Sequence, residues 1–256
     1  MALFKSGNPA INEKVFNNIA VAYGDEAMTV TGALKKFGLM LVMLLGAASF
    51  TWDMFYNKSH GDPSTVMPWM FGGMIGGLIT AIIIIFKKEW APYLALAYAL
   101  FEGLFLGAIS AILNDAFKDK YPDIISQAVL LTFGVAVGMF ALYYFRILKA
   151  TPLFTKIIIM ATVGIAIFYV FDLILHMFGV NIAFLHDSSP LSIGISLFVV
   201  GIAALNLIMD FDLIERGAAQ GAPKYFEWYG AFGLMVTIVW LYLEILRLLT
   251  KIAGRK

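Results

Sequence analysis

The stretch MPWMFGGMIGGLITAIIIIF, residues 67–86, contains no charged side chain. A helix that crosses a bilayer needs about 20 mostly apolar residues, because the hydrocarbon core is about 30 Å thick and each helical residue rises about 1.5 Å. The stretch meets this requirement by itself, and it is longer than the apolar runs of ordinary soluble cores. It therefore predicts an integral membrane protein.

Six further stretches of the same kind flank it in a chain of 256 residues, of which 61% are hydrophobic. A soluble domain is roughly half apolar, so this excess is typical of a protein that crosses the bilayer several times. The predicted spans are residues 34–52, 67–86, 91–113, 124–145, 156–178, 190–210 and 229–250. The pattern predicts an all-α, seven-helix transmembrane domain over residues 33–256.

The N-terminal segment, residues 1–32, is polar and mixed. Within it, AINEKVFNNIAVAY at residues 10–23 is compatible with an amphipathic helix on the membrane surface and equally with a partly ordered tail. Connections on the same side of the predicted bundle as this segment carry eleven Lys and Arg residues, and connections on the other side carry three. Because cytoplasmic loops are enriched in Lys and Arg, the N-terminus is predicted to be cytoplasmic.

The C-terminal end departs from this charge pattern. Arg247, Lys251, Arg255 and Lys256 make it basic, although seven crossings place it outside the cytoplasm. A re-entrant segment with only six crossings is the alternative. The last apolar stretch is long enough to cross, so seven crossings are favoured.

Carboxylates inside the spans give the strongest indication of function. Glu102, Asp172 and Glu244 lie within spans, and Asp210 lies at the edge of the sixth. Such a group costs several kcal/mol in hydrocarbon or binds a proton, so it usually faces a water-filled path, a partner or a proton relay. Glu102 is the deepest, about eleven residues or roughly 16 Å into its span.

Each of these acids also has a local structural explanation. Glu244 can pair with Arg247 three residues later, and Asp172 with His176 four residues later. A protonated Glu102 would hydrogen bond to a helix carbonyl. Close helix packing by small residues, as in FGGMIGGL at residues 71–78, is also expected.

Several function classes are disfavoured by composition and motifs. The net charge of +1 predicts no nucleic-acid partner, and the absence of cysteine excludes disulfides and thiolate metal sites. Neither an HExxH motif nor a glycine-rich phosphate loop occurs, so an enzyme is the weaker hypothesis and no bound cofactor is expected. Carboxylate oxygens suit protons and Ca²⁺, which favours a cation path across the lipid bilayer.

Three segments together carry a family resemblance. They are SGNPAINEKVF…MTVTGALKK near the N-terminus, YALFEGLFLGAIS in the third span, and MDFDLIERG…YGAFGLMVTIVWLYLEILRLL at the C-terminal end. With them the chain resembles the Bax inhibitor family, and more narrowly its prokaryotic, YccA-like branch. The resemblance implies a seven-helix bundle with the last helix central, a pH-sensitive calcium leak or exchanger, and a prokaryotic inner membrane.

The resemblance also implies site residues. In the family, acids on the sixth and seventh helices share a proton, and an arginine near the second helix latches them. Asp210 and Glu244 match the two acids and would form the candidate calcium site, with Glu102 as a further pathway residue. Lys87 or Lys88 falls at the latch position. The family has Asp where this chain has Glu244, and lysine lacks the bidentate fork of arginine.

The spacing of the proposed pair makes a structural prediction. Asp210 and Glu244 are 34 residues apart, so two antiparallel helices bring them level only if the turn centres near Glu227. Residues 217–230, GAAQGAPKYFEWYG, are therefore predicted to be mostly loop or interfacial, with the last spanning helix beginning near Gly230. Arg216, Gly217 and Gly221-Ala222-Pro223 favour an earlier turn instead, which would place Glu244 far above Asp210.

A second function class stays open at this point. The N-terminal segment and the glycine-rich helix faces suit a membrane interaction protein that modulates a membrane-bound quality-control protease or a stress response. Some members of the resembled branch are associated with that role.

Overall fold

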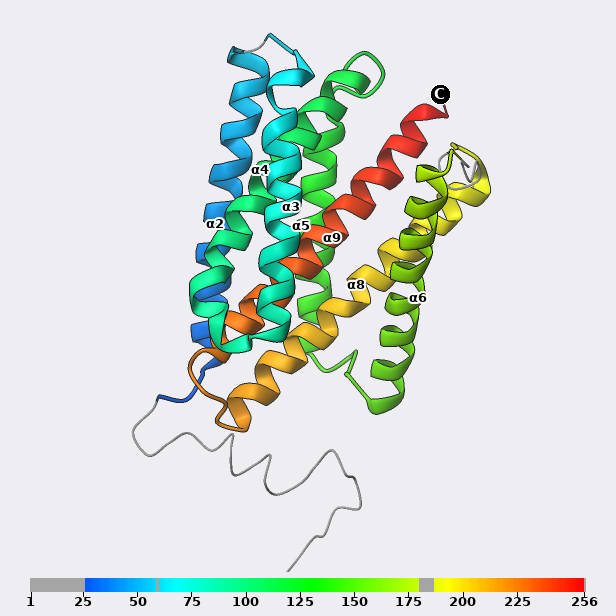
Figure 1. Ribbon diagram of the computed structural model, residues 1–256. Coiled ribbons are helices and arrows are strands. Elements are labelled where there is room, and N and C mark those ends of the chain that lie inside the picture. Colours follow the sequence, from blue (N-terminus) through cyan, green and yellow to red (C-terminus); the bar gives the residue numbers. More distant parts are fainter. Residues whose placement is uncertain (1–25, 59, 180–186, 256) are drawn as a thin grey trace, which may run out of the picture.

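The computed structural model describes residues 26–58, 60–179 and 187–255 (Figure 1). Its seven long helices are α2 (Val30–Asp53), α3 (Met67–Phe86), α4 (Ala91–Phe117), α5 (Ile124–Tyr144), α6 (Pro152–Met177), α8 (Pro190–Ala219) and α9 (Phe226–Gly254). Three short turns adjoin them: η1 (Met54–Lys58), η2 (Pro63–Thr65) and η3 (Lys88–Trp90). Each long helix is long and apolar enough to cross a membrane, which confirms the all-α, seven-helix prediction.

Helix starts are fixed by polar caps that hydropathy alone does not detect. The side chains of Thr29, Thr151 and Ser189 each accept a hydrogen bond from the backbone N–H three residues later, at the starts of α2, α6 and α8. Pro152 and Pro190 then occupy the first helical positions, where the missing N–H costs nothing. This is why α6 begins four residues before the predicted span.

The prediction for residues 217–230 is wrong. Helix α8 continues to Ala219 and α9 already begins at Phe226, so only residues 220–225 lie between them. Gly221 ends α8, because it takes a positive φ of 65° and Ala222 N–H donates back to the carbonyl of Gly217. Pro223 follows and cannot continue the helix.

Glu227 fixes the first turn of α9. Its carboxylate accepts hydrogen bonds from the backbone N–H of Thr29 (2.8 Å) and the hydroxyl of Thr29 (3.0 Å), and it pairs with Lys36 and Lys224. The side chain of Glu227 is 1% exposed. The start of α2 is thereby tied to the start of α9, and Met28 N–H adds a bond to Ala222 O of 2.8 Å.

The described chain begins within the predicted N-terminal segment, since α2 starts at Val30. The stretch over residues 10–23 for which an amphipathic helix or a tail was predicted lies outside the described residues.

Small residues bring α2, α3 and α4 together. A side chain at Gly103 or Gly107 of α4 would overlap the carbonyl oxygen of Leu44 or Ala48 in α2, and a Cβ atom at Gly73 of α3 would lie 2.5 Å from the carbonyl oxygen of Phe101. Close backbone approach of this kind replaces the hydrophobic driving force that is missing in lipid. The expectation of glycine-mediated packing is met at these three glycines.

Helix α9 packs against α2, α4, α5 and α8. The finer prediction that the other six helices surround it is not confirmed, because α3 packs mainly on α4 and α6 packs mainly on α8. Helix α6 stands at the edge of the bundle (Figure 1), and Ile158 is its single buried residue in the described chain.

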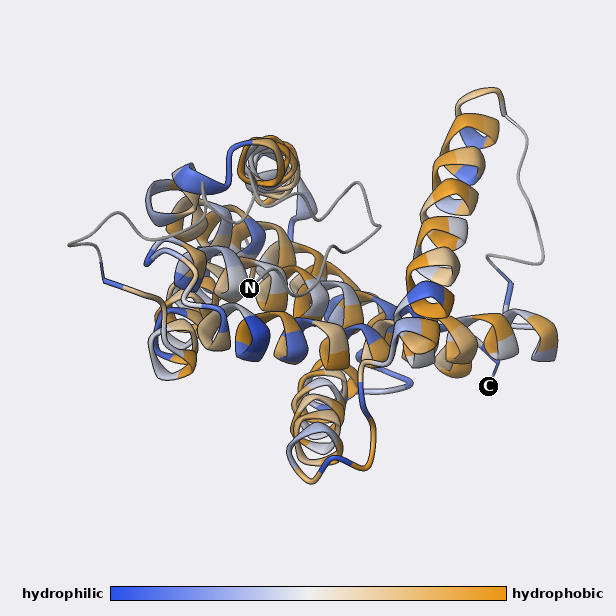
Figure 2. Cartoon of the chain, turned by 90° about the horizontal axis from the view of Figure 1, so that it is seen from below, coloured by the Kyte–Doolittle hydropathy of each residue, from blue (hydrophilic) through white to orange (hydrophobic). Residues whose placement is uncertain are grey.

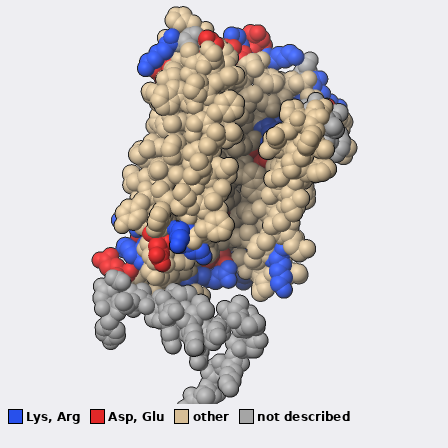
Figure 3. All heavy atoms as spheres, in the orientation of Figure 1, with Lys and Arg blue, Asp and Glu red and all other residues tan. Residues whose placement is uncertain are grey.

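Polar and apolar surfaces are separated as a bilayer requires. Apolar residues cover the sides of the helices in Figure 2, and charged side chains gather at the two ends of the molecule in Figure 3. The described chain enters at one end and leaves at the other (Figure 1), as seven crossings demand. Which end faces the cytoplasm stays a prediction from the Lys and Arg count.

Candidate functional site

Asp210 lies in the contact between α8 and α9. Its Oδ1 would be 3.8 Å from a Cβ atom placed on Gly233 of α9, and its carboxyl group interacts with the hydroxyl of Thr237 on the same helix. Its Oδ2 is buried and has no hydrogen-bond partner within the described part of the chain. A methyl group at Gly233 would be in ordinary van der Waals contact with this carboxyl group, so α9 packs closely over it. An unsatisfied carboxylate oxygen in a membrane-spanning helix contact is expected to hold a proton or to find a cation as its partner.

Glu244 occupies a more polar environment, and it is 2% exposed. The hydroxyl of Tyr169 on α6 donates to both of its carboxylate oxygens, at 3.0 and 3.1 Å. Trp240 Nε1 donates at 3.2 Å, and Arg247 Nη1 lies at 3.2 and 3.3 Å from the two oxygens. The local Glu244–Arg247 pair is therefore present, and Tyr169 adds a contact from another helix.

Asp210 and Glu244 do not form a hydrogen-bonded pair in this structure. Asp210 lies level with Gly233 and Thr237, and Glu244 is seven residues beyond Thr237. At 1.5 Å per residue this is about 10 Å along α9. The physical reason is the short α8–α9 turn, which centres nearer Ala222 than Glu227.

Glu102 lies in a different helix contact. Its Oε1 would be 2.7 Å from a Cβ atom placed on Gly77 of α3, and its carboxyl group interacts with Tyr98 one turn earlier on α4. Tyr98 packs edge-on against Phe232 of α9, with ring centroids 4.9 Å apart. The structure therefore places Glu102 in the contact between α3 and α4. The Tyr98–Phe232 ring contact connects this region to α9, the helix that Asp210 also contacts.

Lys87 and Lys88 lie near the start of α9, far from Glu244. Lys87 caps α3, and the ammonium of Lys88 lies 5.2 Å from the ring centroid of Tyr229. Tyr229 precedes Glu244 by fifteen residues, or about 22 Å of helix. In this structure the cation on Glu244 is Arg247, and the lysines at the predicted latch position contact the start of α9 instead.

A comparison of the sequence with known protein families gives one match. The family model described as "Bax inhibitor 1 like" matches residues 8–254, nearly the whole chain. The chain belongs to the Bax inhibitor 1-like family. No curated protein and no solved structure gave a match. The narrower assignment to the YccA-like branch stays a prediction.

Sequence reasoning missed how α6 is attached in this Bax inhibitor 1-like protein. Asn206 Nδ2 of α8 donates to the hydroxyl of Thr162 at 2.9 Å, and Tyr169 reaches Glu244 of α9. Both contacts join residues that are far apart in sequence, so no local motif marks them. These polar bonds add to the packing of a helix that has one buried residue and otherwise only half-buried and exposed ones.

A cleft of about 350 Å³ lies beside this attachment, between α6 on one side and α8 and α9 on the other. Figure 3 shows a groove in this region, with acidic and basic atoms visible within it. Asp172, Arg247 and Lys251 line the cleft together with apolar side chains. Asp172 thus lies near the arginine that covers Glu244, and its predicted pairing with His176 stays a prediction.

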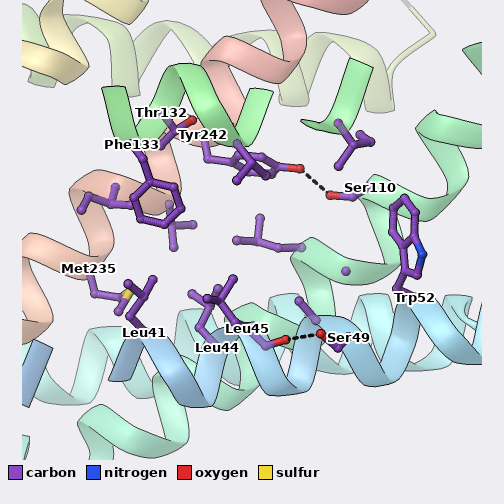
Figure 4. A pocket seen from close by; sticks show the side chains of 17 residues that line it. Leu41, Leu44, Leu45, Ser49, Trp52, Ser110, Thr132, Phe133, Met235 and Tyr242 are labelled. Carbon is purple, nitrogen blue, oxygen red and sulfur yellow. Dashed lines mark hydrogen bonds between the residues drawn. The ribbon is translucent and has the colours of Figure 1, made fainter. Parts of the chain in front are cut away.

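A second cavity, of about 260 Å³, lies between α2, α4, α5 and α9 (Figure 4). Its lining is mostly apolar. The hydroxyl groups of Ser110 and Tyr242 are hydrogen bonded to each other at 2.6 Å, and those of Ser49 and Thr132 donate to carbonyl oxygens of their own helices. No intramembrane acid lines it.

The described residues contain no cluster of three or more His, Cys, Asp or Glu side chains placed to hold a metal ion. The predicted calcium site at Asp210 and Glu244 would therefore need the two acids to approach each other, or oxygen ligands of other kinds.

Proposed function

We propose that this family member passes cations, with Ca²⁺ as the principal candidate, along the contact between α8 and α9. The observation that carries the proposal is the buried Oδ2 of Asp210, which has no hydrogen-bond partner in the described residues and lies opposite Gly233. A carboxylate in this position costs several kcal/mol unless a proton or a cation satisfies it. Membership of the family agrees with this function.

The distribution of acids along α9 supports the proposal. Asp210 is level with Thr237, about 16 Å from the start of α9 at Phe226, and Glu244 is about 27 Å from it. The two carboxylates thus lie at successive heights along one side of α9. Tyr169 and Arg247 cover Glu244, so its access to a cation requires these two side chains to move away. The structure would then represent a closed state.

Protonation gives this arrangement its pH dependence. A carboxyl group that holds a proton has no charge to attract a cation, so flux is expected to rise as pH rises and the acids ionise. The cation then replaces the proton as the partner of the buried oxygen.

Calcium flux into proteoliposomes across pH 6–8 tests the proposal (about one unit either side of neutral). Asp210→Asn and Glu244→Gln are each expected to change both the flux and its pH response, because each removes one charge and keeps the side-chain shape. Asp115→Asn is the matched control, since Asp115 pairs with Lys118 near the end of α4. Unchanged flux and unchanged pH response in both test variants would refute the proposal.

The interaction-protein alternative rests on the N-terminal segment, and residues 1–25 of it lie outside the described structure. If a membrane protease partner binds this segment, deleting residues 1–25 abolishes its capture and leaves calcium flux intact. We also propose that the N-terminus is cytoplasmic and that the protein resides in a prokaryotic inner membrane.

A further inference from the structure

The cleft between α6, α8 and α9 combines an apolar wall with two basic side chains. Ile165 and Phe168 of α6 face Ile195 and Val199 of α8 across it, and Arg247 and Lys251 of α9 also line it. Such a combination is expected for an amphiphile that has an acyl chain and an anionic headgroup, since basic pockets between transmembrane helices bind such headgroups.

Lys251 is a buried basic residue in this cleft. The residue is 8% exposed, and its ammonium donates to Ser196 Oγ at 2.8 Å and to the carbonyl of Ser192 at 3.5 Å. Among the described residues no carboxylate lies within ion-pair distance of it, and Glu244 and Asp187 act on it only from farther away. A cation that is largely removed from water without a direct ion pair is costly, so an anion in the cleft would stabilise it.

Arg247 lies one turn earlier on the same face of α9. Its Nη1 bonds to Glu244, while its side chain remains 45% exposed. The charge of Glu244 is thereby offset by Arg247, and Asp172, the acid that lines the cleft, is engaged in an interaction. Lys251 is therefore the basic group in the cleft that has only neutral partners in the described chain.

The depth of these groups fits a phospholipid. Helix α9 has 29 residues and is about 43 Å long, which exceeds the hydrocarbon core of about 30 Å. Lys251 is three residues, or about 4.5 Å, from the end of the helix, and Arg247 is about 10 Å from it. These positions correspond to the headgroup region and its inner boundary. A free phosphate ion would use the basic groups but leave the apolar wall without a partner.

We propose that this cleft binds one anionic phospholipid, with its phosphate at Lys251 and Arg247 and an acyl chain between α6 and α8. Lipid binding would also explain the basic C-terminal end. This end departs from the charge rule for membrane orientation because part of its positive charge binds the lipid phosphate. The proposal does not rest on ion passage along α8 and α9, although Arg247 lies at both sites.

Native mass spectrometry of the protein with equimolar phosphatidylglycerol and phosphatidylcholine of identical acyl chains tests the proposal. The wild type is expected to retain phosphatidylglycerol preferentially. Lys251→Gln is expected to lower this preference about fivefold, equivalent to about 1 kcal/mol for one lysine at a headgroup. The glutamine can keep the hydrogen bond to Ser196. Arg255→Gln is the matched control, because Arg255 is exposed at the same end of α9.

A second variant tests the acyl-chain part without changing charge. Gly164 of α6 lines the cleft, and a Cβ atom there meets nothing within 4 Å, so a leucine side chain in Gly164→Leu is expected to extend into the cleft. An unchanged far-UV circular dichroism spectrum checks that the variant is folded. It is expected to reduce retention of phosphatidylglycerol. Equal retention of the two lipids by the wild type, or unchanged preference in Lys251→Gln, overturns the proposal. Displacement of the lipid by inorganic phosphate alone would show a free-anion site and overturns it as well.

Discussion

Replacing Glu227 is expected to loosen the connection between α2 and α9 more than replacing any exposed acid. Glu227 accepts two hydrogen bonds from Thr29 and pairs with Lys36 and Lys224 while being 1% exposed. Lys36 is only 17% exposed, so its charge is also partly desolvated. Glu227→Ala removes every one of these contacts and leaves Lys36 without its partner carboxylate.

The magnitude follows from this environment. Two unit charges about 4 Å apart interact by about 4 kcal/mol at an effective dielectric constant of about 20, and removing one partner of a buried pair costs about 3–5 kcal/mol. The remaining exposure of Lys36 reduces the effect, so Glu227→Ala is expected to cost about 2–4 kcal/mol. Glu227→Gln keeps an acceptor for Thr29 and is expected to cost about 1–2 kcal/mol.

The free energy of unfolding in mixed detergent micelles, titrated with SDS, measures both variants. Glu26→Gln is the control, because Glu26 is exposed and also pairs with Lys224. Hydrogen bonds from Lys224 to Glu26 and to Glu227 raise the pKa of Lys224 above its ordinary value, so both acids act on the same cation. A double-mutant cycle between Glu227 and Lys36 isolates the pair. A coupling energy near zero, or Glu227→Ala as stable as Glu26→Gln, would refute the reasoning.

Two further changes test the packing of the bundle by the same unfolding measurement. Gly103→Ala is expected to lower the free energy of unfolding by about 1–3 kcal/mol, because the new methyl group would overlap the carbonyl of Leu44. Gly72→Ala is the control: it has open space around it, so its stability is expected to stay within about 1 kcal/mol of the wild type. Equal stability of the two variants would contradict close packing at Gly103. Ser110→Ala and Tyr242→Phe each break the same buried hydroxyl pair, and each is expected to lower the free energy of unfolding by about 1–2 kcal/mol. The double variant is expected to lose less than the sum of the two single losses, because no unsatisfied hydroxyl remains in it. Strictly additive losses would contradict a direct bond.

The spans could be predicted from sequence because their length and apolarity are imposed by the bilayer. The prediction of residues 67–86 coincides with α3. The helices α2 and α6 begin four residues before the predicted spans, where Thr29 and Thr151 cap them, and the largest difference is at the end of α8, which continues nine residues past the predicted span to Ala219. Such caps depend on single side chains that hydropathy averages out.

The turn between α8 and α9 was not predictable in the same way. Gly217 and Gly221 are both candidate helix ends in the sequence, and the structure uses Gly221. The choice is supported by Glu227, whose partners Thr29 and Lys36 are 198 and 191 residues away along the chain. Contacts at that separation leave no trace in local patterns, and the same holds for Tyr169 and Glu244.

The short turn has a consequence for the acidic pair. Thr237 and Glu244 are seven residues apart, close to two helical turns, so both face the same side of α9. Asp210 and Glu244 therefore lie on one side of α9 but at different heights. A side-chain rotation cannot close about 10 Å, so a shared proton would need α8 to slide along α9 by about two turns. A proton or cation could instead pass between the two acids through oxygen atoms at intermediate heights. The hydroxyl of Thr237, at the level of Asp210, would be the first of these oxygens. This route requires no sliding of α8 and leaves the packing at Gly233 intact.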